Sequence, residues 1–122
     1  MIVVDSFGWI EYLSNGPLTD KYEKYFSDLA KIITPTIVVY EVYKKIKVAG
    51  GEEKALLIIG QIMKTKVIEL NTEIALSAVE VSLRYSLPMA DAIVYATGIN
   101  TKCSVVTSDP HFKNLDGVIF IK

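Results

Sequence analysis

The sequence predicts an α/β fold, a three-layer α/β/α sandwich built on a five-stranded parallel sheet. Short runs of β-branched residues alternate with longer segments of helical periodicity along the whole chain. Strands that are separated by one or two helices pair in parallel through right-handed crossovers, which places helices on both faces of the sheet. Because a chain of 122 residues is most simply one domain, we expect residues 1–122 to form a single domain around one core.

The chain begins with a predicted strand that leads directly into a helix. The run MIVV, residues 1–4, is continuously apolar and β-branched, as expected for a strand that is buried on both faces. Ser6 is a favourable N-cap for a helix that extends to about Leu13. The turn-forming residues 15–17, Asn-Gly-Pro, end that helix.

Two further predicted helices flank a second strand. Residues 18–31 resume helical spacing and predict one helix with its apolar and aromatic side chains on one side, and the run KIIT, residues 31–34, predicts the strand. Residues 36–49 predict a helix that stops at Gly50 and Gly51. Its expected apolar stripe contains Val39, Val42, Tyr43 and Ile46.

The second half of the chain continues the same alternation. It predicts helices over residues 52–66 and 72–86, a strand at 67–70 between them, a helix that begins in LPMADAIVYAT (87–97), strands at 104–109 and 117–121, and a helical turn at 110–114. Pro88 ends the helix over 72–86, because the residue before a proline is biased away from helical backbone.

Composition excludes several classes of protein. With 51% hydrophobic and 22% charged residues and no low-complexity tract, the chain is expected to be globular rather than disordered. Its longest apolar runs fall well short of the ~20 residues of a membrane span, and no basic leader precedes an apolar stretch, so we expect a cytoplasmic protein without membrane association. The one cysteine, Cys103, is expected to pack as a small core residue.

Four acidic residues are expected at one end of the sheet. Asp5 closes the first predicted strand, Asp109 closes the fourth, Asp91 opens the helix before that fourth strand, and Glu41 lies in the helix after the second strand. In open α/β sheets, binding sites form at the carboxyl ends of the strands, near the switch in strand order. The topology therefore predicts that these acids converge.

Three of these acids have alternative structural roles. Asp5 could accept a turn hydrogen bond, and Asp91 could cap its helix or complement the helix dipole. Asp109 stands before Pro110, which is the sequence of an N-cap with proline at the first helical position. Capping and metal coordination are both compatible with these positions.

Glu41 has two alternative environments. Lys45 follows it by four residues, which is the favoured order for a helical ion pair, and the predicted apolar stripe lies nearly opposite Glu41. Both features favour a solvated side chain. Ile37 and Val48 lie on the same side as Glu41, however, which favours a position beside a cleft. Periodicity leaves the two alternatives open.

A cluster of four carboxylates requires a cation. Two carboxylates ~5 Å apart repel by about 3 kcal/mol at an effective dielectric constant of 20. Oxygen ligands without a set of cysteines or histidines select Mg²⁺ or Mn²⁺, which retain waters and bind substrate phosphates. Such ions lower the pKa of an attacking water and neutralise charge on a leaving oxygen, so the predicted chemistry is phosphodiester hydrolysis.

Other catalytic chemistries lack their residues. His111 is the only histidine, which argues against a two-histidine ribonuclease and a serine triad, and we expect it at the surface or at the edge of the substrate. A receiver domain would need an aspartate after the third strand, where the chain has Leu70 and Asn71. An Asp-x-Asp phosphatase motif is absent because Phe7 stands two residues after Asp5.

The whole chain resembles the PIN-domain nucleases, and within them the VapC-like toxins of bacterial and archaeal toxin–antitoxin pairs. The resemblance is carried by IVVDSFGWIEYL, TPTIVVYEVYKKI, LPMADAIVYATG and VVTSDPHFKNLDGV, in this order. It implies that Asp5, Glu41, Asp91 and Asp109 are the catalytic, metal-binding acids. Asp116 is a nearby rival for the fourth position, and we expect Asp109 because it stands at the strand end. Ser6 and Thr107 are expected to support these acids with their hydroxyl groups.

The resemblance also implies an activity and partners. It implies a Mg²⁺- or Mn²⁺-dependent endoribonuclease that cleaves single-stranded RNA, acts as a toxin, is restrained by a small antitoxin and forms a homodimer. Because the net charge is −1, RNA would have to be bound locally, and Lys44, Lys45 and Lys47 near Glu41 are candidates, with Lys102 and Lys113 beyond them. The alternative is a non-catalytic PIN-like binding or assembly module whose acids cap helices.

Overall fold

The computed structural model describes all 122 residues and contains one sheet with five strands. The strands are β1 (Ile2–Val4), β2 (Ile32–Pro35), β3 (Lys66–Ile68), β4 (Ser104–Thr107) and β5 (Val118–Phe120). All neighbours pair in parallel, in the order β3-β2-β1-β4-β5. The order reverses at β1, which lies at the centre of the sheet between β2 and β4. The predicted five-stranded parallel sheet is therefore confirmed.

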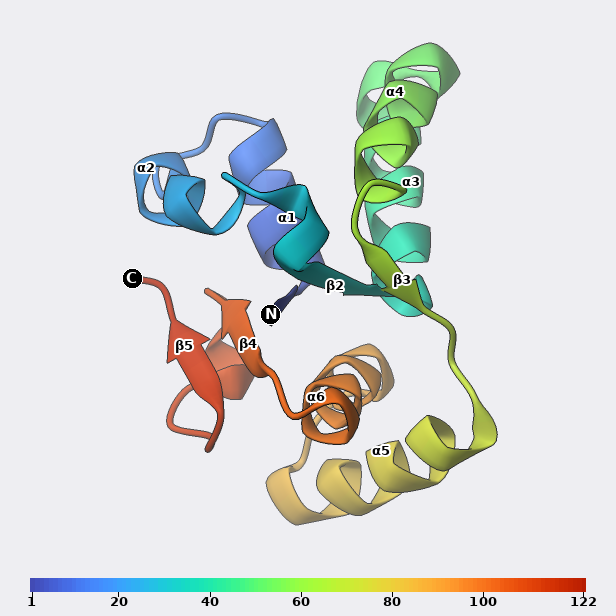
Figure 1. The fold of residues 1–122 in the computed structure, drawn as a ribbon, viewed down its shortest axis with the longest axis vertical. Coiled ribbons are helices and arrows are strands. Elements are labelled where there is room, and N and C mark those ends of the chain that lie inside the picture. Colours follow the sequence, from blue (N-terminus) through green and yellow to red (C-terminus); the bar gives the residue numbers. More distant parts are fainter.

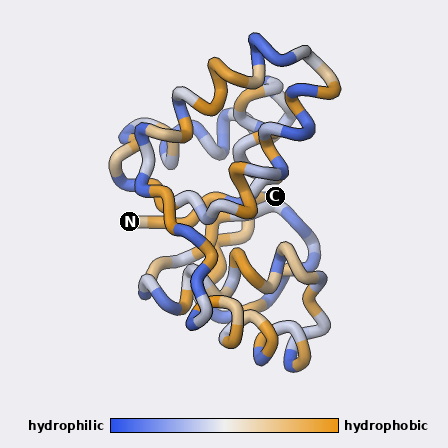
Figure 2. The backbone as a smooth tube through the Cα atoms, turned by 90° about the vertical axis from the view of Figure 1, so that its right-hand side faces the viewer, coloured by the Kyte–Doolittle hydropathy of each residue, from blue (hydrophilic) through white to orange (hydrophobic).

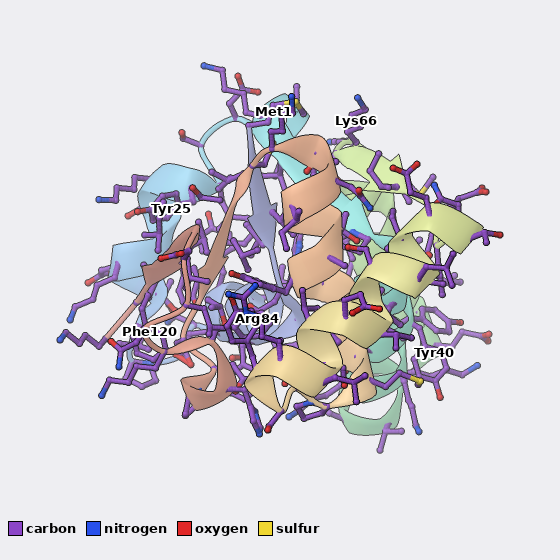
Figure 3. The ribbon with its side chains drawn as sticks, turned by 90° about the horizontal axis from the view of Figure 1, so that it is seen from below. Met1, Tyr25, Tyr40, Lys66, Arg84 and Phe120 are labelled. Carbon is purple, nitrogen blue, oxygen red and sulfur yellow. The ribbon has the colours of Figure 1, made fainter.

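Helices cover both faces of the sheet (Figure 1). On one face lie α1 (Ser6–Leu13), α2 (Thr19–Tyr22), α3 (Thr36–Gly50) and α4 (Glu52–Ile62). On the other face α5 (Thr72–Tyr85) packs against α6 (Met89–Thr101), and the two cross one side of the molecule in Figure 3. The predicted three-layer α/β/α sandwich is confirmed.

The core lies on both sides of the central strands. Val3 and Val4 of β1 and Val105 and Val106 of β4 are all buried. Because successive strand residues face opposite sides, such continuous apolar strands need a helical layer on each face. In α6 every residue from 92 to 98 is buried, since this helix packs between the sheet and α5. The other helices mix hydrophobic and hydrophilic residues along their length (Figure 2).

The segment between α1 and β2 differs from the single helix that was predicted over residues 18–31. It contains α2 followed by two short 3₁₀ helices, η1 (Glu23–Tyr25) and η2 (Leu29–Lys31). The chain leaves the helical path at Phe26, whose ring stacks on Tyr12 at 4.2 Å between centroids and meets Trp9 edge-on at 4.9 Å. Aromatic packing here outweighs the helical spacing of the sequence.

Three smaller predictions are also corrected. Helix α4 ends at Ile62 and not at residue 66, because the buried Thr65 hydroxyl donates to the Ile62 carbonyl and is hydrogen-bonded to Thr34, which turns the chain into β3. Strand β4 ends at Thr107, two residues before Asp109. Cys103 is partly buried and packs against the edge of the core and not within it. None of the helices has the length and apolar character needed to cross a membrane.

Candidate metal centre

Asp5 follows β1 directly and begins α1. Its Oδ1 accepts the backbone N–H of Gly8 at 3.0 Å, so Asp5, and not Ser6, is the N-cap of this helix. A Cβ atom on Gly8 would lie 2.6 Å from Val4 Cγ1 and 2.8 Å from the Tyr22 ring. Glycine at position 8 therefore allows the first turn of α1 to close over the end of β1, which places the Asp5 carboxylate at the carboxyl edge of the sheet.

The Asp5 carboxylate is buried with few partners. It is 3% exposed, and its Oδ2 accepts a hydrogen bond of 2.5 Å from the hydroxyl of Thr107, the last residue of β4. Burial raises the pKa of Asp5 to about 7; the hydrogen bonds from Thr107 and Gly8 oppose this rise, and the negative charges of Asp109 and Asp91 add to it. A buried acid in this state favours a bound cation.

Asp109 lies two residues beyond the end of β4 and is also buried, with 5% exposed. Its backbone N–H donates to the Thr107 hydroxyl at 2.9 Å. Its Oδ1 accepts the backbone N–H of His111 at 2.9 Å and caps the short 3₁₀ helix η3 (Pro110–Phe112). The N-cap predicted for Asp109 is thus observed, and the cap holds its carboxylate beside the end of β1.

Asp91 is not an N-cap. Pro88 occupies the cap position of α6, and Asp91 lies in the first helical turn, where the helix dipole favours a negative charge. Its side chain is 20% exposed. Partial burial raises the pKa of Asp91 to about 6, the negative charge of Asp109 adds to the rise, and His111 opposes it.

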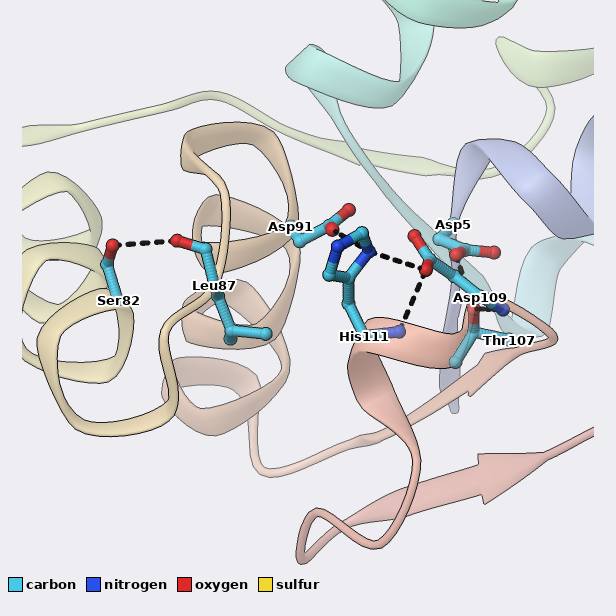
Figure 4. Close-up of polar contacts among 7 residues, drawn as sticks. All are labelled: Asp5, Ser82, Leu87, Asp91, Thr107, Asp109 and His111. Carbon is cyan, nitrogen blue, oxygen red and sulfur yellow. Dashed lines mark hydrogen bonds and ion pairs between the residues drawn. The ribbon is translucent and has the colours of Figure 1, made fainter.

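His111 connects two of these acids (Figure 4). Its Nδ1 lies 2.8 Å from Oδ1 of Asp109 and 3.3 Å from Oδ2 of Asp91. One ligand atom from each of the three residues lies within 4.8 Å of the others. The half-exposed ring agrees with the surface position expected from the sequence, but its contacts with the acids were not predicted. The available signal was the spacing, because a tight turn after Asp109 brings residue 111 back to the capping carboxylate.

Glu41 is partly buried beside the acids. It forms no ion pair with Lys45, so that alternative is wrong. The buried face of α3 contains Val38, Val42 and Ile46, which places Glu41 at the edge of that face. Burial raises the pKa of Glu41, a hydrogen bond with Ser6 partly offsets the rise, and the negative charge of Asp109 adds to it.

A groove of about 770 Å³ extends from Glu41 along the surface between α1 and α3. It is lined by Ser6, Phe7, Ile10, Glu11, Tyr40, Glu41, Lys44, Lys45, Val48 and Ala49. The cleft alternative for Glu41 therefore agrees with the structure. Asp116 lies elsewhere, in a smaller pocket of about 250 Å³ that also contains Cys103 and Lys102.

The acids fit a hard divalent cation by their donor chemistry, although only Asp91 and Asp109, with His111, have ligand atoms within 4.8 Å of one another, and Asp5 and Glu41 lie outside that group. No lysine or arginine forms an ion pair with any of the four acids. This agrees with the raised pKa values of Asp5, Glu41 and Asp91, because a nearby cation would lower them. Carboxylate oxygens are the ligands that Mg²⁺ and Mn²⁺ prefer. An ion held among these oxygens would stabilise their ionised forms.

Comparisons with known proteins agree with the fold. The family described as "PIN domain" matches residues 2–118 of the chain. No curated protein matches the chain in sequence.

Several solved structures resemble the chain at low sequence identity. A toxin–antitoxin complex from Klebsiella pneumoniae superposes with a TM-score of 0.83 at 19% identity, covering 98% of this chain and 96% of that chain. The DNA-bound VapBC from Salmonella typhimurium gives 0.79 at 16% identity, covering 98% and 97%. The sarcin-ricin loop cleaving toxin VapC20 from Mycobacterium tuberculosis gives 0.72 at 14% identity, covering 86% and 87%. At these identities the likeness shows a shared fold.

Proposed function

The chain belongs to the PIN-domain family, and from this premise we propose that it is a metal-dependent endoribonuclease that cleaves single-stranded RNA as the toxin of a toxin–antitoxin pair. The observation that carries the proposal is an acidic group without a lysine or arginine partner: Asp91 and Asp109 lie together with His111, and the charge of Asp109 acts on both Asp5 and Glu41. Hydrolysis of a phosphodiester by bound Mg²⁺ or Mn²⁺ requires such a group of oxygen ligands.

Each acid has a proposed task in this reaction. Asp5, Glu41, Asp91 and Asp109 would hold Mg²⁺ or Mn²⁺, which when bound activates water and stabilises charge on the leaving oxygen. Thr107 orients Asp5 and supports the backbone of Asp109. Glu41 borders both the acids and the α1–α3 groove, so we assign it the orientation of the attacking water at the substrate phosphate. Ser6 lines the same groove beside Glu41, and we assign it the orientation of that carboxylate.

The α1–α3 groove suits a single nucleic acid strand. Phe7 and Tyr40 are large aromatic residues that remain 50% and 59% exposed beside it, and Tyr40 projects at the edge of the molecule in Figure 3. Lys44 lies with its Nζ 5.6 Å from the centroid of the Tyr40 ring, and Lys45 lines the same groove. Exposed aromatic rings stack unpaired bases while lysines bind phosphates, which favours single-stranded RNA as the substrate.

Two partners are part of the proposal. Because the similar structures from Klebsiella and Salmonella are toxin–antitoxin complexes, we propose that a cognate antitoxin restrains this chain in the cytoplasm. The homodimer stays a prediction. It is supported by an unpartnered apolar stripe on α5, where Leu76, Val79 and Leu83 are 65%, 52% and 78% exposed, and light scattering on the purified protein tests it.

The deciding experiment measures cleavage of RNA by the purified chain. We expect it to cut a single-stranded RNA with Mg²⁺ or Mn²⁺ and to leave the matching duplex intact. Asp5→Asn and Asp91→Asn should abolish cutting while circular dichroism remains unchanged. Asp116→Asn is the matched control and should retain activity, because Asp116 lies in the separate pocket. Cleavage that persists in excess EDTA would contradict the proposal.

A non-catalytic binding module is the second candidate, because Asp5 and Asp109 both act as helix caps. In such a module Asp5 and Asp109 would serve only as helix caps. It would show no stabilisation by divalent ions, whereas an ion that binds only the folded chain raises the unfolding temperature.

A further inference from the structure

The imidazole of His111 lies where a further ligand of the proposed metal site would lie. Two ligands at right angles around an ion at 2.0–2.1 Å are separated by about 3 Å. The His111 Nδ1 atom lies 2.8 Å from Oδ1 of Asp109 and 3.3 Å from Oδ2 of Asp91, on either side of that value. The nitrogen therefore has the spacing of a neighbouring ligand to each of the two oxygens, and one ligand atom from each of the three residues lies within 4.8 Å of the others.

The main chain holds the ring in this place. Pro110 stands at the first position of η3, and the His111 N–H donates to the same Asp109 oxygen that its ring approaches. Without a metal, the ring can donate an Nδ1 hydrogen bond to that carboxylate. In the tautomer that carries its proton on Nε2, the Nδ1 lone pair faces the two carboxylates, so the ring does not have to move to bind an ion.

From this geometry we propose that His111 is a nitrogen ligand of the metal held by Asp91 and Asp109, and that it selects a transition-metal ion such as Mn²⁺ over Mg²⁺. The inference rests on the metal site of the proposed function and adds a ligand of a different chemical class. Mg²⁺ binds oxygen almost exclusively, whereas imidazole raises the affinity of a mixed nitrogen and oxygen site for transition metals. Four carboxylates alone would provide no such preference.

Pulsed electron paramagnetic resonance of bound Mn²⁺ tests the ligand directly. His111 is the only histidine of the chain, so in untagged protein an imidazole ¹⁴N modulation on Mn²⁺ can arise only from this residue. We expect the modulation in the wild-type protein and its loss in His111→Ala. Bound Mn²⁺ without a nitrogen signal in the wild-type protein would overturn the inference.

Calorimetric titration of Mn²⁺ and Mg²⁺ tests the selectivity. His111→Ala should weaken Mn²⁺ binding at least about tenfold and change Mg²⁺ binding much less. His111→Asp replaces the nitrogen by an oxygen and should restore Mg²⁺ binding without restoring the preference for Mn²⁺. An equal loss of both ions in His111→Ala would mean that the ring only positions Asp91 and Asp109, and would overturn the proposal. Thermal unfolding of each metal-free variant controls for folding.

These outcomes distinguish a failure of the His111 proposal from a failure of the proposed ribonuclease activity. A nitrogen signal on Mn²⁺ in a chain that cuts no RNA would support His111 as a ligand and remove the proposed ribonuclease activity. Metal-dependent cutting without the nitrogen signal would leave the ribonuclease and remove His111 from the metal.

Discussion

The hydroxyl of Thr107 donates to Oδ2 of Asp5 at 2.5 Å, which joins the last residue of β4 to the carboxylate at the end of β1. The same hydroxyl oxygen accepts the backbone N–H of Asp109 at 2.9 Å. Thr107 is fully buried, with 0% exposed, so water cannot replace either hydrogen bond if the hydroxyl group is removed. One hydroxyl group thus sets the relative positions of two of the acids.

Thr107→Val should weaken the site more than the fold. The isosteric change removes both hydrogen bonds, and we expect a loss of about 1–3 kcal/mol in the free energy of unfolding, measured in urea. Groups that orient metal ligands typically contribute about 10–100-fold to affinity or activity, so cleavage should fall by that factor. Thr101→Val is the control, since it removes a hydrogen bond to Thr97 at the far end of α6 and should leave cleavage unchanged.

Asp5→Asn should stabilise the metal-free chain at pH 8 while it abolishes cleavage. The pKa of Asp5 is raised to about 7, so at pH 8 the wild-type chain must hold a buried charge with no cation nearby. Removing that charge should raise the free energy of unfolding, measured in EDTA, by a few kcal/mol relative to the same comparison at pH 5. A variant that is equally destabilised at both pH values would contradict this explanation.

The stability of the metal-free wild-type chain should fall as the pH rises from about 4 to about 7. The pKa of Asp5 is about 7 and that of Asp91 about 6 in the folded chain, against 3.8 for an ordinary aspartate. Between these values the unfolded chain releases protons that the folded chain retains, so a rise in pH favours unfolding, and the effect levels off above the folded pKa values. Urea unfolding across this range, compared with Asp5→Asn and Asp91→Asn, isolates their share.

Saturating Mn²⁺ should reverse this pH dependence. An ion binds the deprotonated carboxylates, so binding must displace the protons that Asp5 and Asp91 carry at pH 6. The increase in unfolding temperature on adding Mn²⁺ should therefore be larger at pH 8 than at pH 6. Asp5→Asn should lose most of the increase, and an increase of the same size in this variant would remove Asp5 from the metal site.

Lys44→Gln and Lys45→Gln should weaken RNA binding without changing the chemical step. Both lysines line the α1–α3 groove, where they would contact phosphates. We expect KM to rise several-fold, kcat to change little, and the salt dependence of binding to decrease by about one phosphate contact per lysine. Lys66→Gln is the matched control, because Lys66 begins β3 and lies well away from Tyr40 and the groove (Figure 3).

The sheet and its layers could be predicted because each relevant signal is local. Runs such as the one containing Val3 and Val4 predict buried strands, and strands that are separated by helices must pair in parallel. The path through Phe26 could not be predicted in this way. The chain stops being helical at Phe26, whose ring packs on Tyr12 and Trp9 of α1. Those contacts form only when α1 has packed against this segment, so the local sequence does not indicate them.

The site was partly predictable for the same reason. Asp5 and Asp109 follow strands, so topology predicts their common edge. Glu41 was ambiguous because the four apolar residues 37–40 before it offer more than one face, and the fold buries Val38 where the sequence favoured Val39. The helical turn after Asp109 was predicted from its cap and Pro110, but the sequence did not indicate that a tight 3₁₀ turn returns the His111 ring to the Asp109 carboxylate.

The strand order has a consequence for how the chain is made. Strand β1 acquires its neighbour β4 only when residues 104–107 are available, and Asp109 and His111 follow even later. A ribosome that has synthesised the first 100 residues has therefore produced Asp5, Glu41 and Asp91 but not the strand that aligns them. If the chain cleaves RNA, a nascent or truncated polypeptide that lacks residues 104–111 has no β4 to align its acids and should not cleave RNA.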